Sequence, residues 1–194
     1  MLRFEVLGPL RAWRGGTPLG LGPVKRQAVL AALLLRRGAV VSHERLLDAV
    51  WGEEPPAGGH KVLPTHVNSL RRALDPEGTT PAESVIRSGK GWYRFVVEEV
   101  GLDTADLDER GAEALRTVAS SDLATAADQL GAVIGLFRGE PLTGVPGPFA
   151  QEERQRWEER RRTYLLGQRR ARDGVRGSRP VSPPQPSPSV PFPT

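Results

Sequence analysis

The chain has 194 residues, enough for one medium domain or two small ones. It contains no cysteine, which excludes a disulfide framework, a thiol nucleophile and a thiolate metal site. No apolar run approaches the roughly 18–20 residues that span a bilayer, and the N-terminus lacks the layout of a signal peptide. We therefore expect a cytoplasmic protein with no membrane partner.

The net charge of +4 hides an uneven distribution of charged residues. Residues 1–97 carry 14 Lys/Arg and 8 Asp/Glu, whereas residues 98–151 carry 3 and 10. A basic half joined to an acidic half is typical of a nucleic-acid or anionic-surface module tied to a second element. Random scatter of charge produces differences of this size in many enzymes, so charge alone leaves both interpretations open.

The first fifty residues predict short strands followed by two helices. The β-prone runs RFEVLG, LRAW and LGL are separated by Gly-Pro and Gly-rich turns, which predicts a small three-stranded sheet. Residues 24–37 are apolar on nearly every side, as in a helix at the middle of a core, and Gly38 supplies its end. Ser42 is a natural N-cap for a second helix, whose apolar residues repeat at helical spacing up to Gly52.

A third helix is expected to end at about Leu74, because the following Asp-Pro pair disfavours helix. At about 100° per residue, one face of this helix is an apolar stripe and the opposite face is polar. A solvated surface usually mixes charge signs, but no acidic residue lies between Gly58 and Leu74, which favours a groove-reading helix. The stripe contains Leu63, Val67, Leu70 and Leu74, and the opposite face presents Lys61, Thr65, Asn68 and Arg72, with Ser69 and Arg71 on its flanks.

Two residues of the third helix need separate interpretation. His66 lies near the edge of the apolar stripe, where packing is a better interpretation than contact with DNA. Pro64 lacks a backbone donor, so it either kinks the helix or occupies its first turn. In the second case Lys61 belongs to the preceding loop.

The segment SVIRSGKGWYRFVV predicts two strands around a tight Gly-rich turn. Glycine allows close approach of the backbone to phosphate, and Arg87 and Lys90 supply positive charge. Strands, three helices and a hairpin, in that order, are the layout of a winged helix-turn-helix, whose third helix enters the major groove. The GKG sequence is not part of a P-loop.

The second half predicts three helices, over residues 105–118, 123–137 and 149–166. Three helices are few for a domain of stacked helix pairs, so we expect their apolar faces either to dimerise or to pack on the first domain. After Leu166 the chain becomes basic and Gly-rich, then Pro-rich, which favours a disordered tail over a Pro-rich binding segment. Such a tail is interpretable as a linker, a natural truncation or a frame-shifted end.

Several segments together resemble one known family. LRFEVLGPLRAWRGG, VVSHERLLDAVWGEEPP, THVNSLRRAL and GKGWYRF closely resemble the N-terminal part of the Streptomyces antibiotic regulatory protein family, over roughly residues 1–97. LFRGEPL and PFAQEERQRWEERR are similar to the start of its bacterial transcriptional activation domain. The resemblance implies an α+β winged helix of the OmpR/PhoB type over 1–97, followed by an all-α, helix-pair (TPR-like) partial domain over 98–166 and a tail over 167–194.

The resemblance also implies a function and its residues. Family members are transcriptional activators that bind direct repeats near promoters, contact RNA polymerase and switch on antibiotic biosynthesis genes, which implies double-stranded promoter DNA, polymerase and a homodimer on the repeats as partners. The polymerase-contact loop maps to residues 53–59, with Glu53 and Glu54. Pro64 and the short activation domain depart from the family pattern. By this resemblance, the DNA-binding positions map to Thr65, His66, Asn68, Ser69, Arg71 and Arg72 in the recognition helix and to residues 87–93 in the wing.

Two other classes of function compete with this interpretation. The chain has only three histidines, and neither paired catalytic carboxylates nor a nucleophile elbow is recognisable, so we expect no enzyme, no metal site and no cofactor. The acids of residues 98–113 are interpreted as a linker and a helix start. A helical adaptor without DNA binding is the second alternative, and the salt dependence of binding to a DNA duplex separates it from a regulator.

Overall fold

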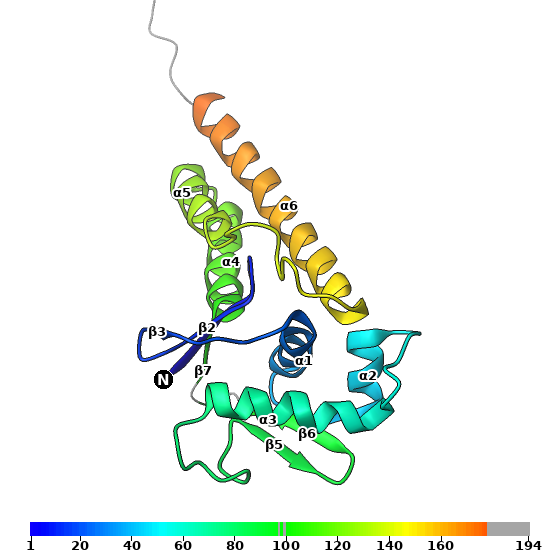
Figure 1. The fold of residues 1–194 in the computed structure, drawn as a ribbon. Helices are drawn as coiled ribbons and strands as arrows, with labels where there is room; N and C mark the ends of the chain where they lie inside the picture. The colour runs from blue at the N-terminus through cyan, green and yellow to red at the C-terminus, as the bar shows by residue number, and fades with distance from the viewer. Residues whose placement is uncertain (97, 99, 178–194) are drawn as a thin grey trace, which may run out of the picture.

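The computed structural model describes residues 1–96, 98 and 100–177. Three strands, three helices with a two-residue strand between the first two, and a hairpin are followed by one further strand and three further helices (Figure 1). The predicted fold class, a winged helix followed by an all-α part, is confirmed. Figure 1 shows α3 (Val62–Leu74) and the hairpin of β5 (Ile86–Gly89) and β6 (Trp92–Phe95) at one end of the molecule, and the C-terminal end of α6 (Pro148–Gly177) at the other.

The N-terminal sheet has one strand more than predicted, and its third strand lies at Thr17–Pro18, which was expected to be a turn, and not in the LGL run of residues 19–21. β1 (Leu2–Glu5), β2 (Arg11–Arg14) and β3 (Thr17–Pro18) are antiparallel neighbours, and β7 (Val100–Leu102) pairs with β1 in parallel. The segment that contains β7 was expected to be an acidic linker. Its three residues carry no strand pattern of their own, because the partner that makes them a strand is almost a hundred residues away.

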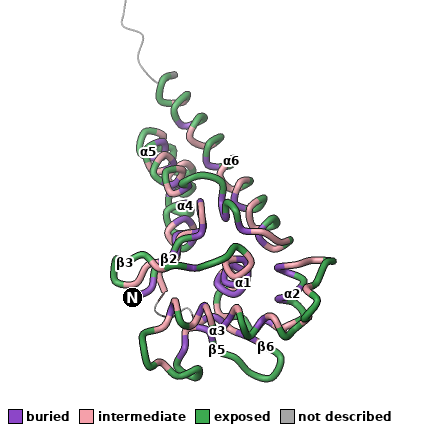
Figure 2. Tube along the Cα trace, in the orientation of Figure 1, coloured by how far each residue is buried: buried purple, intermediate pink, exposed green. Residues whose placement is uncertain are grey.

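Three helices form the core of the winged helix: α1 (Val24–Leu34), α2 (His43–Trp51) and α3 (Val62–Leu74). Seven consecutive residues of α1, from Ala28 to Leu34, are buried, as the apolar run predicts (Figure 2). The predicted cap of α2 is confirmed, since the backbone N–H of Arg45 donates to Ser42 Oγ at 3.2 Å. The strand β4 (Val41–Ser42), which precedes α2, pairs antiparallel with β6 of the β5–β6 hairpin.

The start of α3 resolves the two alternatives for Pro64. A 3-10 turn, η1 (Gly59–Lys61), precedes α3, which begins at Val62. Pro64 is therefore the third residue of the helix, where its missing N–H would have had no partner within the helix. Lys61 lies in the turn before the helix, as the second alternative predicts.

The helical half consists of α4 (Asp103–Ala119), α5 (Leu123–Ile134) and α6 (Pro148–Gly177). The prediction that helical structure ends at Leu166 is wrong, because α6 continues for eleven residues beyond it. Gln168 Nε2 donates to the carbonyl oxygen of Ala127 at 3.1 Å, and Ala171 is buried. This contact with α5 uses small residues instead of large apolar ones, which is why periodicity did not reveal it. Residues 178–194 of the predicted tail lie outside the described residues.

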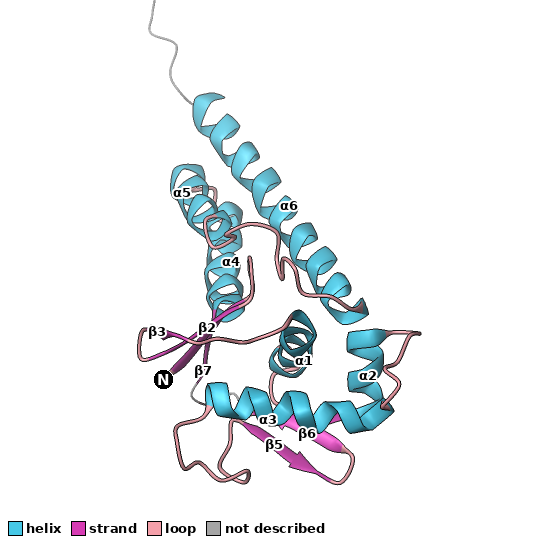
Figure 3. Cartoon of the chain, in the orientation of Figure 1, coloured by secondary structure: helices cyan, strands magenta, loops and turns pink. Residues whose placement is uncertain are grey.

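The helical half packs on the winged helix of the same chain. Leu7 is buried with Trp157 and Tyr164 of α6, while Leu142 of the α5–α6 loop belongs to the winged-helix core. The backbone N–H of Leu142 donates to Val6 at 2.9 Å. This loop leads from α5 to the start of α6, which contacts α2 (Figure 3). Packing in cis, one of the two predicted alternatives, is therefore what the described residues show.

Candidate nucleic-acid interface

The polar face of α3 is presented as its periodicity predicts. The stripe residues Leu63, Val67, Leu70 and Leu74 are each fully buried. The opposite face is exposed. The helix lies at the same end of the molecule as the β5–β6 hairpin (Figure 1). Its exposed members are Lys61, Thr65, Asn68 and Arg72.

Arg71, one of the predicted DNA contacts, is engaged inside the protein. Its Nε and Nη2 donate to the carbonyl oxygen of Ile86 at 2.9 and 2.7 Å, and Nη2 also donates to Ser88 Oγ at 3.0 Å. Two bonds from a planar guanidinium to one carbonyl fix both distance and orientation. Arg71 therefore attaches the recognition helix to the first strand of the wing, a contact that the sequence did not predict.

Ser69 and His66 also make contacts within the chain. The Ser69 hydroxyl donates to the carbonyl oxygen of Thr65 at 2.9 Å, one turn earlier in α3. The His66 ring lies 5.8 Å from that of Trp51, centroid to centroid, and is half-buried. Burial, followed by the positive charge of Arg26, lowers the pKa of His66. These contacts favour the packing interpretation of His66.

The wing is a tight hairpin of β5 (Ile86–Gly89) and β6 (Trp92–Phe95). Gly91 has a φ of +79°, which favours glycine, and a Cβ on Gly89 would lie only 2.4 Å from the Trp92 ring. The backbone N–H of His43 donates to the Gly91 carbonyl oxygen at 2.9 Å, so the start of α2 supports the wing turn. Both predicted wing cations, Arg87 and Lys90, are exposed.

The cations of this surface are available for binding. Among residues 1–96, 98 and 100–177, no ion pair involves Lys61, Arg72, Arg87 or Lys90. We call the exposed face of α3 together with Arg87 and Lys90 the basic face. It offers the amide, hydroxyl and guanidinium groups that read base edges and hold phosphates.

The predicted polymerase-contact loop lies between α2 and α3. Glu53 and Glu54 are both exposed, and they follow α2 directly after Gly52. Gly52 itself lies against the start of α6, since a Cβ there would meet the Pro148 ring at 3.0 Å. The two carboxylates thus lie beside the junction of the two halves of the chain.

Asp103 is the residue whose role the sequence analysis missed. It was assigned to an acidic linker, yet it is 2% exposed and accepts hydrogen bonds of 3.0 Å from the backbone N–H groups of Val6 and Leu7. Arg138 pairs with it and also with Glu5. Burial raises the pKa of Asp103, while these donors and Arg138 act in the opposite direction. The carboxylate joins the N-terminal sheet to α4.

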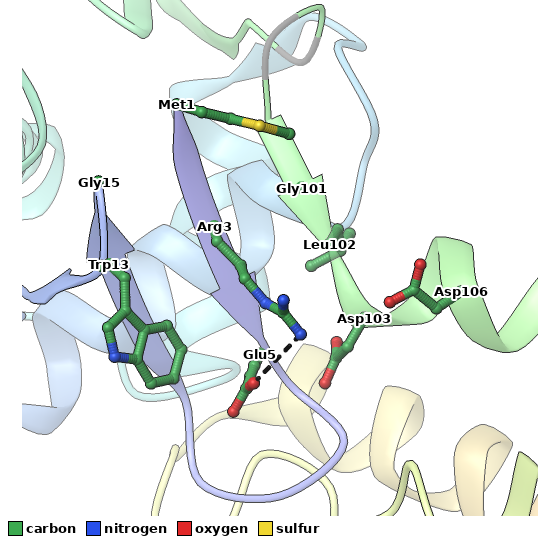
Figure 4. Close-up of a pocket in the computed structure, with 10 residues that line it drawn as sticks. Met1, Arg3, Glu5, Trp13, Gly15, Gly101, Leu102, Asp103 and Asp106 are labelled. Atoms are coloured by element: carbon green, nitrogen blue, oxygen red, sulfur yellow. Dashed lines mark ion pairs between the residues drawn. The ribbon is translucent and has the colours of Figure 1, made fainter. Parts of the chain in front are cut away.

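A pocket of about 710 Å³ lies on the N-terminal sheet beside Asp103 (Figure 4). Trp13, Arg3 and Glu5 line it, and Arg3 pairs with Glu5 at 3.7 Å. None of the predicted DNA-binding residues lies in this pocket. No cluster of His, Cys, Asp or Glu in the described part of the chain could hold a metal ion. No described helix has both the length and the hydrophobicity to cross a membrane.

A winged helix with an exposed basic face, packed on a helical domain, defines a class of two-domain regulators. Two family models match this division: "Transcriptional regulatory protein, C terminal" over residues 17–94, and "Bacterial transcriptional activator domain" over residues 102–172. The chain belongs to the Streptomyces antibiotic regulatory protein family, which joins these two domains. The second match extends past Leu166, in agreement with the length of α6.

Individual relatives support this assignment. The chain is 42% identical over 156 residues to the regulatory protein AfsR of Streptomyces coelicolor, which covers 80% of this chain and 15% of AfsR. It is 30% identical to the regulatory protein DnrI of Streptomyces peucetius, covering 74% and 54% of the two chains. The solved structure of Mycobacterium tuberculosis EmbR with a low-affinity phosphopeptide matches 90% of this chain and 46% of EmbR, with a TM-score of 0.79 and 26% identity. The chain thus spans about a sixth of the length of the AfsR relatives that it matches.

Proposed function

We propose that the chain is a sequence-specific regulator that binds promoter DNA through the basic face and activates transcription of an antibiotic or other secondary-metabolite gene cluster. The observation that carries this proposal is an acid-free helix face, exposed beside a wing whose cations have no ion pairs in the described part of the chain. The α3 helix enters the major groove and the wing contacts the flanking phosphates. The chain acts by binding and not by catalysis.

Binding to a promoter duplex at several salt concentrations tests the proposal. Each phosphate neutralised by Lys or Arg releases counterions, so log K should fall with log salt by about 0.9 per contact. A flat salt response would instead favour the helical adaptor. Arg72→Ala and Lys90→Ala should weaken binding and reduce the slope by about 1 each. Arg170→Ala, which removes an exposed arginine from the distant part of α6, is the matched control and should leave binding unchanged.

Activation is proposed to use the loop with Glu53 and Glu54, which faces RNA polymerase when the chain is bound upstream of a promoter. Replacing both residues with alanine should leave DNA affinity unchanged and reduce transcription in a purified system. Replacing Glu77, an exposed carboxylate in the loop after α3, is the control. Equal transcription by the wild-type protein, the double alanine variant and the Glu77 control would contradict the role of the loop.

The bound form is proposed to be a pair of chains on direct repeats. A duplex with two repeats should bind two chains in sedimentation experiments, and a duplex with one repeat should bind one. Binding of one chain by both duplexes would contradict this stoichiometry.

A further inference from the structure

A second cavity lies where the two halves of the chain meet, apart from the basic face. It has a volume of about 290 Å³ and is bounded by the end of α1, the first turns of α4 and the N-terminal half of α6. α1 contacts α3 and also α6, so the cavity lies behind the recognition helix and not on its exposed face. The residues that define its chemistry are Arg36, Thr104, Asp108, Arg156, Trp157 and Arg160.

Three residues that line this cavity carry buried polar atoms without partners. Thr104 is 0% exposed and Trp157 is 3% exposed, yet neither the Thr104 hydroxyl nor the Trp157 indole N–H has a hydrogen-bond partner in the described part of the chain. Arg36 Nε is unpartnered in the same way. Eight buried side-chain N or O atoms of the described residues have no hydrogen-bond partner, and three of them belong to residues that line this cavity.

The charges around the cavity are not balanced. Asp108 is shared by Arg37 and Arg160, at 2.7 and 2.6 Å. Arg156 pairs with Glu153 at 3.5 Å and lies over the Trp157 ring at 5.6 Å, and the Arg36 guanidinium lies over the Phe149 ring at 5.1 Å. Four arginines thus face two carboxylates among the residues that line the cavity.

We propose that this cavity binds a small phosphate-bearing anion. The guanidinium groups that line the cavity are donors only and exceed the lining carboxylates by two, which matches the acceptor-only chemistry of phosphate oxygens. Arginine binds such oxygens through charge-assisted, frequently bidentate hydrogen bonds. The volume is close to the lower end of ordinary ligand sites, about 300 Å³, which suits inorganic phosphate or a small phosphomonoester.

A bound anion would contact both halves of the regulator. Arg36 follows the end of α1 in the winged helix, whereas Thr104 lies in the first turn of α4 and Trp157 lies in α6. The ligand would therefore stabilise the junction between the two domains. This inference does not depend on DNA binding, and its test needs no DNA.

Binding can be measured on the whole chain by titration with inorganic phosphate or a nucleoside monophosphate, with chloride at matched ionic strength. Tryptophan fluorescence and the thermal unfolding midpoint report on the cavity, because Trp157 lines it. Saturable binding with a raised midpoint is expected for at least one of the two anions. If both bind, the phosphate group itself is the ligand, and if only the ester binds, the ligand is an organic phosphate. Absence of saturable binding by either would overturn the proposal.

Two arginines of α6 provide a matched pair of variants. Arg156 and Arg162 are 66% and 71% exposed, and each has a glutamate three residues earlier, but only Arg156 lines the cavity. Arg156→Gln and Arg36→Gln should weaken anion binding about tenfold or more, while Arg162→Gln leaves it unchanged. Equal loss in Arg156→Gln and Arg162→Gln would show nonspecific attraction and overturn the site.

Discussion

Arg138 forms an ion pair with Asp103, and this pair fixes the loop that follows α5 to the first residue of α4. Removing the Asp103 carboxylate leaves the buried N–H groups of Val6 and Leu7 without their acceptor, at a typical cost of about 1–3 kcal/mol each, although Arg138 keeps its pair with Glu5. We therefore expect Asp103→Ala to lower the free energy of unfolding by about 3 kcal/mol, measured by urea denaturation. Asp106→Ala, one turn later in α4, should cost less than about 1 kcal/mol. Similar losses in the two variants would contradict the special role of Asp103.

Arg71 and Arg72 are neighbours with different expected roles. Lysine keeps the charge of arginine but not its planar fork, so Arg72→Lys should retain most of the DNA affinity if Arg72 contacts phosphate. Arg71→Lys loses the double hydrogen bond to Ile86 and should lower affinity about tenfold, as expected for a loss of about 1.4 kcal/mol. Amide exchange in residues 86–95 should rise in Arg71→Lys alone. An unchanged affinity and exchange rate in that variant would show that the contact does not position the wing.

Asn68 is expected to read a base edge. Asparagine pairs with adenine through two hydrogen bonds, which are worth about 1–3 kcal/mol of discrimination. Asn68→Ala should therefore relax the sequence preference in a binding selection, whereas Lys61→Ala should weaken binding to all sequences alike. If Asn68→Ala lowers affinity equally for every duplex, Asn68 does not read a base.

The Arg37–Asp108–Arg160 cluster predicts a pH dependence of stability. Burial alone would raise the pKa of Asp108, but the hydrogen bonds and charges of Arg37 and Arg160 outweigh it, so the pKa is lowered. A carboxyl with a lowered pKa in the folded state stabilises the fold above its unfolded pKa of about 4, and this contribution is lost as the pH falls through the folded value. Wild-type protein should thus lose more stability in acid than Asp108→Asn. The difference should be less than about 1 kcal/mol because the pair is partly exposed, and parallel profiles would refute it.

The parts of the fold that were predicted correctly depend on local signals. The burial of Leu63, Val67, Leu70 and Leu74 follows from a 3.6-residue period, and the Ser42 cap follows from one residue at a helix start. The exposure of Asn68 and Arg72 follows from the same period. The basic face was therefore accessible to reasoning from sequence.

The parts that were missed depend on distant partners. β7 is a strand because it pairs with β1. Asp103 is buried where the backbone N–H groups of Val6 and Leu7 donate to its carboxylate. Nothing in the sequence distinguishes Arg71 from the other cations on the flank of α3, because its partner, the Ile86 carbonyl, is fifteen residues away. The last turns of α6 pack through alanine and glycine, which carry no hydrophobic period. Each of these contacts joins residues that sequence spacing does not relate.

The parallel pairing of β1 with β7 determines how this regulator can be recombined with its relatives. The strand that begins the helical half is a structural member of the DNA-binding half, and Leu142 of the later loop fills the same core. A chimera joined at residue 97 would combine the winged helix of one parent with the β7 strand of the other. Exchange of promoter specificity between relatives should therefore succeed more often when the crossover lies after the α5–α6 loop, because β1, β7 and Leu142 then come from the same parent.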